Sequence, residues 1–419
     1  MSTEGGEQVN HTILIGDVIA CLRSLPDACV QCVVTSPPYW GLRDYGVEGQ
    51  IGLEPTPEEY VEKMVEVFRE VWRVLRDDGT LWLNLGDSYN GSGGAGGDYA
   101  PGGLKAGQPK YPGRRISALK PKDLVGIPWR VAFALQADGW YLRSDIIWSK
   151  PNPMPESVTD RPTKSHEYVF LLAKRPRYFY DIDSIREPPT GRTGTMWFWK
   201  KGMEGQAKGN RNDAERVMQK DGSIGCNRRT VWEIATQLMP DAHFATFPEA
   251  LVKPCIMAGT SARGACPKCG APWRRVVERE EDAGLARSAG GKADEQPETD
   301  RAKRLGQRRN AARAAGGNHT NPLGGRVTAR WEPTCTCGTE ETVPCVVLDP
   351  FGGSGTVAKV ARDLGRSSIL IEINPEYVQI AKKRLRIGEQ LDSGVCEYVV
   401  KNFRPEAILS PYDEIRRLG

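Results

Sequence analysis

A glycine-rich turn constrains the fold of this chain more than any other feature. The apolar run Val346–Asp349 predicts a buried strand, and it is followed by the segment PFGGSGT and a predicted helix over Val357–Leu364. Glycines between a strand and a helix let the backbone approach a ligand closely. A further strand over Ser368–Ile371 leads to Glu372, about 20 residues on, where a carboxylate can hydrogen-bond a ribose diol. This order predicts a nucleoside-binding α/β fold.

The ligand of this turn is expected to be a nucleoside without a polyphosphate tail. No Gly-Lys-Ser/Thr follows the glycines, so the turn lacks the residues of a phosphate-binding P-loop. S-adenosyl-L-methionine fits this requirement. The alternative is a turn that serves only close packing of a helix on a strand. The residues predicted to bind the cofactor here are Asp349, Phe351, Gly352, Gly353, Ser354, Gly355, Thr356 and Glu372.

The rest of the chain also alternates strands with helices. We predict helices over Val18–Leu25 and Pro57–Leu75, the second ended by Gly79. Such alternation indicates a mostly parallel sheet with helices on both faces, and 419 residues suffice for one large domain with insertions. The other predicted elements are strands at Thr12–Ile15, Cys32–Thr35, Leu81–Leu85, Tyr141–Trp148 and Tyr168–Leu172, and helices at Pro128–Ala137 and Pro375–Arg386.

Composition is that of an ordinary soluble protein, with 26% charged residues and a net charge of +4. No apolar run reaches the roughly 20 residues that a bilayer requires, so we expect no membrane association. The polar, acidic N-terminal residues do not resemble a signal peptide. We therefore expect a cytoplasmic protein.

A second motif follows the predicted strand Cys32–Thr35 and reads SPPYW. Its two prolines fix the backbone and remove two N–H donors, which leaves carbonyls pointing outward from a stiff turn. An aminopyrimidine amine is a poor nucleophile, because its lone pair is delocalised into the ring. Acceptors at the Ser36 hydroxyl and the Pro37 carbonyl would hold both amine hydrogens, so that the lone pair points at a methyl sulfonium. The predicted catalytic residues are Ser36, Pro37, Pro38 and Tyr39, with Tyr39 stacking on a base pulled out of the duplex.

Together the two motifs resemble the DNA amino-methyltransferases that carry a Ser/Asp/Asn-Pro-Pro-Tyr signature. The catalytic motif comes first, which resembles the β group of that family. Two further segments, from Asp145 to Tyr168 and from His243 to Glu249, resemble the family's stretches near the flipped base and the methionine. The resemblance implies a Rossmann-like class I methyltransferase sheet, circularly permuted. It further implies that Asp17 meets the adenine of the cofactor and Asp349 its ammonium.

The resemblance implies site-specific methylation of double-stranded DNA, and Ser36 favours N4 of cytosine over N6 of adenine. Methylation of an RNA base or a glutamine amide is a more distant alternative. Transfer to C5 of cytosine would need a cysteine nucleophile where this chain has Ser36. A rival of another class is a non-catalytic, zinc-bearing DNA-binding protein. A restriction endonuclease is a candidate counterpart, and the oligomeric state stays open.

Four of the eleven cysteines predict a structural zinc site. Cys266 and Cys269 form a Cys-x-x-Cys-Gly knuckle, and Cys335 and Cys337 supply a second pair of thiolates. Cys345 is a substitute ligand and Cys255 a more distant one. The alternative is four thiols without a metal.

The organisation of the chain follows from these motifs. The stretch 186–230 is basic and contains the aromatic run Trp197–Trp199, which makes it the candidate for target recognition; a variable surface insertion is the alternative. Residues 278–330 are poor in apolar side chains, and we expect them to be disordered. The predicted parts are a catalytic part at 10–185, the target-recognition insert at 186–230, a return to the core at 231–260, a zinc-ribbon-like insert with a basic loop at 261–340, a cofactor-binding part at 341–390 and a C-terminal extension at 391–419.

Overall fold

The computed structural model describes residues 9–91, 119–187, 226–239, 242–279, 326–387 and 396–402. The chain divides into two compact units. The main unit comprises Met1–Ile185, Arg229–Arg274 and Pro333–Gly419, and the second unit comprises Arg186–Arg228 and Arg275–Glu332. Among the described residues, none of the helices has the length and apolar character that crossing a membrane demands.

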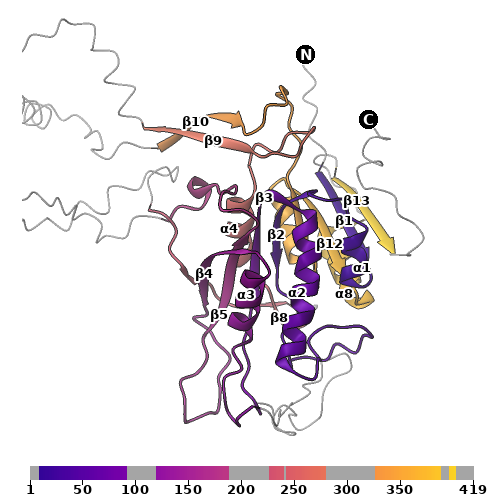
Figure 1. The fold of residues 1–419 in the computed structure, drawn as a ribbon, viewed down its shortest axis with the longest axis vertical. Helices are drawn as coiled ribbons and strands as arrows, with labels where there is room; N and C mark the ends of the chain where they lie inside the picture. The colour runs from indigo at the N-terminus through magenta and orange to yellow at the C-terminus, as the bar shows by residue number, and fades with distance from the viewer. Residues whose placement is uncertain are drawn as a thin grey trace, which may run out of the picture. The chain divides into compact units, whose positions relative to one another are not determined.

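A nine-stranded sheet forms the centre of the main unit (Figure 1). Neighbouring strands are parallel except around β5, which is antiparallel to both of its neighbours. The prediction of a mostly parallel α/β sheet is confirmed. From one edge to the other, the strands are β13 (Cys396–Asn402), β1 (Val9–Ile15), β12 (Ser367–Glu372), β11 (Val346–Asp349), β2 (Val30–Thr35), β3 (Leu75–Leu85), β5 (His166–Ala173), β4 (Tyr141–Ser149) and β6 (Val231–Glu233).

Helices cover both faces of this sheet (Figure 1), because side chains along a strand alternate between the faces. Val33 and Leu83 pack with helices α1 to α3 on one face, whereas Val34 and Trp82 pack with α4 and α7 on the other. Helix α8 packs with α7 against β1 and β12. The helices are α1 (Val18–Arg23), α2 (Pro57–Val74), α3 (Ile127–Ala137), α4 (Glu249–Gly259), α7 (Thr356–Asp363) and α8 (Pro375–Leu385), with a 3₁₀ turn η1 at Ile182–Ile185.

Two smaller sheets complete the described structure. One pairs β7 (Gln237–Met239) with β8 (Ala242–Thr246) in antiparallel register, and the other pairs β9 (Trp273–Arg279) with β10 (Arg326–Pro333). The prediction of disorder over 278–330 is therefore wrong at both ends, where the chain forms β9 and β10. The two strands pair only with each other and carry several charged residues, so the sequence contains no buried apolar run from which to predict them.

The C-terminal part also differs from its prediction as an extension. Residues Cys396–Asn402 form β13, which pairs in parallel with β1 along its whole length. The four cysteines of the predicted insert at 261–340 belong to the main unit, and only Arg275–Glu332 falls in the second. The predicted aromatic run Trp197–Trp199 lies outside the described residues.

The boundary between α2 and β3 lies earlier than predicted. Helix α2 ends at Val74, and β3 already begins at Leu75, so Gly79 lies within the strand. The register between β2 and β3 shifts there. A Cβ at Gly79 would lie 2.4 Å from the Leu75 side chain and 2.9 Å from the Gln31 carbonyl. Gly79 is therefore explained by close packing in the sheet and not by ending a helix.

Candidate active site

The two motifs of the sequence lie side by side at the carboxyl ends of β2 and β11. These strands are neighbours, with Cys32 opposite Val347 and Val33 opposite Leu348. Just beyond, the Thr35 hydroxyl donates a hydrogen bond of 2.7 Å to Asp349 Oδ1. Ligands of open α/β sheets bind at such strand ends. Two residues that are 314 positions apart in the sequence thus meet at one edge of the sheet.

Asp349 is buried at this junction. Besides the bond from Thr35, its Oδ1 accepts one of 3.1 Å from the Phe351 backbone N–H. Burial raises the pKa of Asp349 to about 7, helped by the nearby charge of Glu372, although the two hydrogen bonds oppose the shift. A cationic group bound beside such a carboxyl, for example an ammonium group, would stabilise its ionised form.

In the glycine-rich turn, Gly352 packs closely against β12, whereas Gly353 has open space beside it. A Cβ at Gly352 would lie 2.2 Å from Leu370 Cγ, so only glycine lets the turn pack against β12. Gly353 has a left-handed φ of +48°, and no heavy atom of the described residues lies within 4 Å of where its Cβ would be. The structure therefore leaves open space beside Gly353.

Glu372, at the end of β12, holds the glycine-rich turn through one carboxylate oxygen and the start of α8 through the other. Oε2 accepts from Gly353 N and Oε1 from Asn374 N, each at 2.7 Å. Burial raises the pKa of Glu372 above its usual range. Each carboxylate oxygen has a second lone pair, so Glu372 can hold the turn and still accept from ribose hydroxyls.

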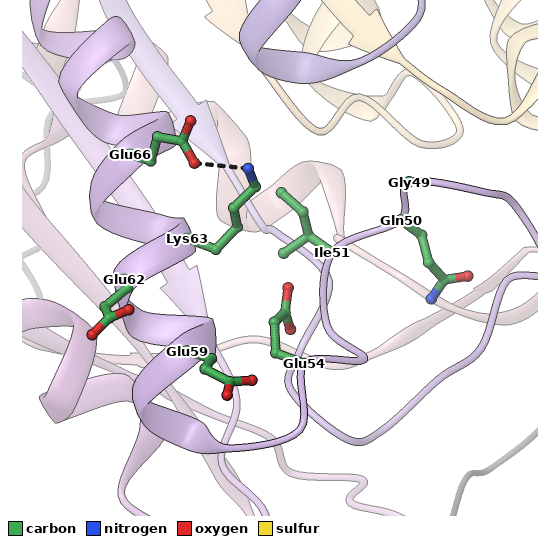
Figure 2. Close-up of a pocket in the computed structure, with 8 residues that line it drawn as sticks. All are labelled: Gly49, Gln50, Ile51, Glu54, Glu59, Glu62, Lys63 and Glu66. Atoms are coloured by element: carbon green, nitrogen blue, oxygen red, sulfur yellow. Dashed lines mark hydrogen bonds and ion pairs between the residues drawn. The ribbon is translucent and has the colours of Figure 1, made fainter.

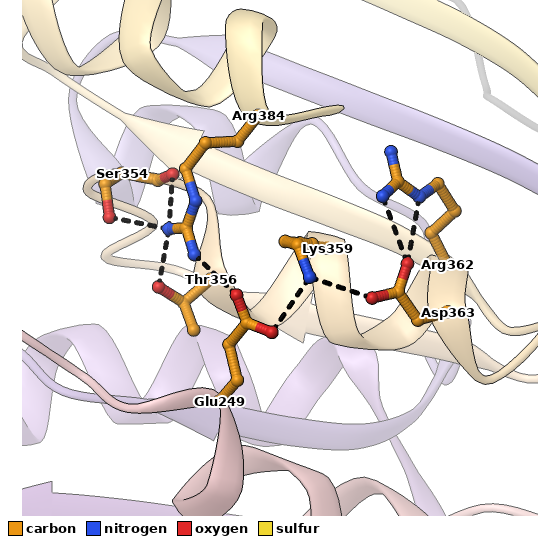
Figure 3. Close-up of polar contacts among 7 residues, drawn as sticks. All are labelled: Glu249, Ser354, Thr356, Lys359, Arg362, Asp363 and Arg384. Carbon is orange, nitrogen blue, oxygen red and sulfur yellow. Dashed lines mark hydrogen bonds and ion pairs between the residues drawn. The ribbon is translucent and has the colours of Figure 1, made fainter. Parts of the chain in front are cut away.

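Ser354 and Thr356 bind an arginine from the protein itself (Figure 3). Arg384 of α8 donates through Nη1 to Ser354 O at 3.0 Å, Ser354 Oγ at 3.0 Å and Thr356 Oγ1 at 2.8 Å. Its Nη2 donates to Glu249 Oε1 at 3.1 Å, and the other Glu249 oxygen accepts from Lys359. Both residues were predicted to bind the cofactor, and in the structure their hydroxyls join the turn to Arg384.

Asp17 lies at the carboxyl end of β1, one strand beyond Glu372. Its Oδ1 caps helix α1 by accepting from Ala20 N at 2.9 Å. The preceding Gly16 N donates to the Glu372 carbonyl at 3.1 Å, which joins this turn to the end of β12. Asp17 therefore lies on the same edge as the other predicted cofactor residues.

Helix α2 and the end of β3 support the proline turn, Ser36–Tyr39. The Tyr60 hydroxyl of α2 donates to the Pro38 carbonyl at 2.9 Å. A Cβ at Gly86 would lie 2.5 Å from the Tyr39 ring, so this glycine lets the ring pack against the end of β3. Ser36 remains half-buried. The four predicted catalytic residues thus form a supported turn at the carboxyl edge.

Three residues beside this turn were not predicted as site residues: Asn84, Glu167 and Lys150. Tyr39 OH lies 2.7 Å from Glu167 Oε2 and 3.0 Å from Asn84 Oδ1, and Lys150 forms an ion pair with Glu167. Burial, followed by the charge of Glu167, raises the pKa of Tyr39 well above its usual value. Asn84 had one sequence signal, an amide within the apolar run Leu81–Leu85, since a buried amide needs partners.

The four predicted metal-binding cysteines meet in the main unit. The Sγ atoms of Cys266, Cys269, Cys335 and Cys337 all lie within 4.8 Å of one another. Burial alone would raise the pKa of the Cys266 thiol, but backbone N–H groups of the knuckle and the other thiols lower it to about 7. Cys345, considered as a substitute ligand, is buried elsewhere and lies near the Ser261 carbonyl.

The cysteine knuckle packs at the amino ends of the strands whose carboxyl ends form the active site. Gln31 of β2 donates to the Gly270 carbonyl at 3.0 Å and accepts from Val346 N, at the start of β11, at 2.7 Å. Arg76, at the start of β3, donates to the Cys269 carbonyl and pairs with Asp78. The cysteine site and the catalytic turn therefore lie at opposite ends of β2, β3 and β11.

A pocket of about 370 Å³ lies between α2 and the loop over residues 49–54 (Figure 2). Its lining carries mainly carboxylates, and its one lysine, Lys63, pairs with Glu66 at 2.7 Å. A negative lining repels DNA phosphates. The residues that line the pocket are Gly49, Gln50, Ile51, Glu54, Glu59, Glu62, Lys63 and Glu66, none of which was predicted to act in catalysis or cofactor binding.

The sequence of the chain is similar to those of known DNA methyltransferases. A family model described as DNA methylase matches residues 30–266 and 344–383. Type II methyltransferase M.Cfr9I of Citrobacter freundii is 38% identical over 90% of this chain and 87% of its own length. M.XycI of Xanthomonas campestris pv. cyanopsidis is 39% identical over the same shares. A DNA modification methylase of Thermus thermophilus, solved with S-adenosyl-L-methionine, gives a TM-score of 0.45 at 18% identity, covering 94% of this chain and 100% of that one.

Proposed function

Because the chain belongs to the N4/N6 family of DNA amino-methyltransferases, we propose that it transfers a methyl group from S-adenosyl-L-methionine to N4 of cytosine in double-stranded DNA. The observation that carries this proposal is the bond between Thr35 and Asp349. It joins a turn suited to an amine and a turn suited to a nucleoside at adjacent strand ends. A methyl group needs only a short, in-line path between two such ligands.

The residues at the glycine-rich turn fit this cofactor. The open backbone at Gly353 admits a nucleoside, and Glu372 retains lone pairs for its ribose. Asp349 would face the ammonium of the methionine part, and Asp17 the adenine. When bound, the cofactor supplies an electrophilic methyl group on a positively charged sulfur. Phe351, Gly352 and Gly355 would shape the turn, which Arg384 fixes through Ser354 and Thr356.

On the substrate side, the Ser36 hydroxyl and the Pro37 carbonyl would accept both hydrogens of the target amine. This arrangement favours a pyramidal nitrogen whose lone pair points away from the ring and toward the methyl group. With the cofactor bound, this nitrogen would take the methyl group from its sulfur, and one of the two hydrogens held by Ser36 and the Pro37 carbonyl would then leave as a proton to solvent. The rate advantage comes from positioning and from fixed dipoles. Tyr39 and Pro38 would hold the base, which must leave the duplex to reach this edge.

The choice of N4 of cytosine rests on Ser36, which resembles the N4-cytosine members of the family; N6 of adenine is the second candidate. The test is methylation of mixed-sequence duplex DNA with methyl-labelled cofactor, followed by digestion to nucleosides and mass spectrometry. We expect N4-methylcytosine. N6-methyladenine would replace the proposed target with the second candidate, and no product would indicate a non-catalytic DNA-binding protein.

We also propose that the four-cysteine site holds one structural Zn²⁺. Tetrahedral zinc with S–Zn bonds of about 2.3 Å places its sulfurs about 3.8 Å apart. The four Sγ atoms, all within 4.8 Å of one another, are close to this spacing. Elemental analysis of the purified protein should find one zinc per chain. Purified protein that contains no zinc would exclude the site.

The relatives are designated type II methyltransferases, which supports a restriction endonuclease as the counterpart of this protein.

We assign DNA target recognition to the stretch 186–230. The sequence of the stretch 186–230 combines Lys and Arg with the aromatic run Trp197–Trp199. Basic and aromatic groups of this kind suit phosphates and bases. Exchange of 186–230 with the corresponding stretch of a relative of different specificity should change the methylated sequence. An unchanged sequence would place recognition elsewhere.

A further inference from the structure

A buried hydrogen-bond network connects the catalytic turn with two strands of the sheet. Asn84 lies in β3 with 1% of its surface exposed, and Glu167 lies at the start of β5. The antiparallel pairing of Leu85 with Tyr168 brings these strands together. The network reaches Ser36, whose hydroxyl is 3.3 Å from Asn84 Oδ1 and 3.3 Å from the Tyr39 hydroxyl.

The partners of Asn84 fix which way its amide points. Nδ2 donates to the Tyr168 carbonyl at 3.0 Å and to Glu167 Oε2 at 3.2 Å. Both partners are acceptors, so the NH₂ group must face them and cannot be exchanged with the oxygen. Asn84 Oδ1 is thereby turned toward the catalytic turn, where it is available as an acceptor.

The protons of the two hydroxyls follow from this orientation. Tyr39 has one proton, and its shortest contact, 2.7 Å, is to Glu167 Oε2. The Ser36 proton then has Asn84 Oδ1 as its strongest acceptor, since an amide oxygen is a better acceptor than a phenol that is already donating. Asn84 and Tyr39, the two partners of the Ser36 hydroxyl, both belong to the buried network. The Ser36 proton therefore points into the network, and its lone pairs point away from it.

We propose that Asn84 is a positioning residue that takes the Ser36 proton and so presents the Ser36 lone pairs to the target amine. This inference rests on the proposed function. A freely rotating hydroxyl would also donate its proton to the amine nitrogen, which would occupy the lone pair that must attack the methyl group. Fixing the rotation removes that unproductive arrangement before the base arrives.

A double-mutant cycle tests the coupling between Asn84 and Ser36. We expect Asn84→Ala to lower kcat by about 10- to 100-fold, within the range of one positioned polar group. In the Ser36→Ala background the same change should cost less than about twofold, because no proton remains to be oriented. Equal losses in both backgrounds would overturn the inference. Near-normal turnover of Ser36→Ala itself would instead overturn the proposed function, so the two failures are distinct.

Asn90 offers a matched control for the loss of a buried amide. It is 3% exposed, and its Nδ2 donates to the carbonyls of Leu119 at 2.8 Å and Lys120 at 3.1 Å. Asn90→Ala should lower thermal stability and leave kcat near that of the unmodified protein. If Asn90→Ala reduces kcat as much as Asn84→Ala does, the effect of Asn84 is structural and the inference fails.

A second variant keeps the test informative if Asn84→Ala folds poorly. Asn84→Asp has the same shape, and in its protonated form it can donate to Glu167 while accepting from Ser36. Ionisation removes that donor and adds a charge beside Glu167, with Tyr39 and the Glu167–Lys150 pair facing the position. The ratio of mutant to unmodified kcat should therefore fall as the pH rises. A ratio that does not change with pH would contradict the inference.

Discussion

The two ends of strands β2 and β11 have opposite kinds of polar chemistry. At the carboxyl end, Thr35 and Asp349 meet beside the catalytic turn. At the amino end, Gln31 joins the start of β11 to the cysteine knuckle. Thr35 lies four residue steps after Gln31 along β2, a distance of about 13 Å at roughly 3.3 Å per residue. The same strands therefore serve two separate sites.

The polar groups at the two ends differ in how much of their hydrogen-bonding capacity is left for a ligand. Gln31 uses both ends of its amide, and Arg76 lies between a carbonyl and Asp78, so these groups fasten the knuckle to the sheet. Glu372 and Ser36 use only part of their bonding capacity, and the pKa of Asp349 is shifted to about 7. Perturbed and partly satisfied groups are typical of functional sites. Changes at the carboxyl end should alter reaction and binding, whereas changes at the amino end should alter stability.

The largest effect is expected for Ser36→Ala. Loss of the hydroxyl acceptor should lower kcat by about 100- to 1,000-fold, as for other single groups that act on the transition state. Cofactor affinity should change by less than about twofold, because the hydroxyl acts on the amine. Single-turnover methylation and calorimetry measure the two quantities. Ser24→Ala, which removes a hydroxyl bonded to the Cys21 carbonyl in α1, is the matched control and should retain turnover.

The pH dependence of cofactor binding is the next largest expected effect. Burial raises the pKa of Asp349 to about 7, so below that pH the carboxyl is mostly neutral and attracts an ammonium weakly. Affinity should rise about tenfold per pH unit between about pH 5 and 7 and then level off. Asp349→Asn should bind weakly with a flat profile in calorimetry, whereas Glu376→Gln, at an exposed carboxyl, should keep the slope. A slope that survives in Asp349→Asn would contradict the assignment.

A smaller change is expected when the anchor of the glycine-rich turn is removed. Arg384→Ala loses the bonds to Ser354 and Thr356 and should weaken cofactor binding by about tenfold, or ~1.4 kcal/mol. Lys359→Ala is the matched control, since Lys359 shares Glu249 with Arg384 but bonds otherwise to Asp363. Equal losses of affinity in both variants would mean that the Glu249 ion pairs matter and not the contacts with the turn.

The smallest effect on the active site is expected for metal removal. A ligand at about 100 times its Kd stabilises a fold by about 2.7 kcal/mol, so chelation should lower the Tm by several degrees. Cofactor affinity should remain unchanged, because the knuckle is bonded to Gln31 and Arg76, at the amino ends of β2 and β3. Differential scanning fluorimetry and calorimetry, with Cys345→Ala as a buried cysteine outside the cluster, measure both. If cofactor affinity fell in proportion to metal content, the cysteine site and the active site would not be independent, and this account of the two strand ends would be wrong.

Local patterns predicted most of the central sheet and both motifs. The glycine-rich turn and the proline turn each depend on residues within a few positions of one another. Their proximity followed from a family resemblance and from the rule that ligands bind at the ends of parallel strands. Gly79 shows the limit of such patterns, because its role depends on Leu75 and Gln31 across a register shift.

The network around Ser36 could not be predicted in the same way. Asn84 and Glu167 are 83 residues apart and meet only because β3 and β5 pair in antiparallel fashion. The hydrophobic pattern of a strand constrains its register only once its partner is known, and the sequence does not say that β3 and β5 are partners. The strand β13 was missed for a related reason, since a single edge strand after a long interval gives no signal until β1 is present to pair with it.

A crystal structure with S-adenosylhomocysteine and duplex DNA containing the methylated sequence would test the central claim most directly. We predict the amine of an extrahelical cytosine within hydrogen-bond distance of Ser36 Oγ and the Pro37 carbonyl, with the cofactor sulfur on its far side, over Gly353. A target amine bound away from Ser36, or a cofactor bound away from the turn between Asp349 and Glu372, would contradict it.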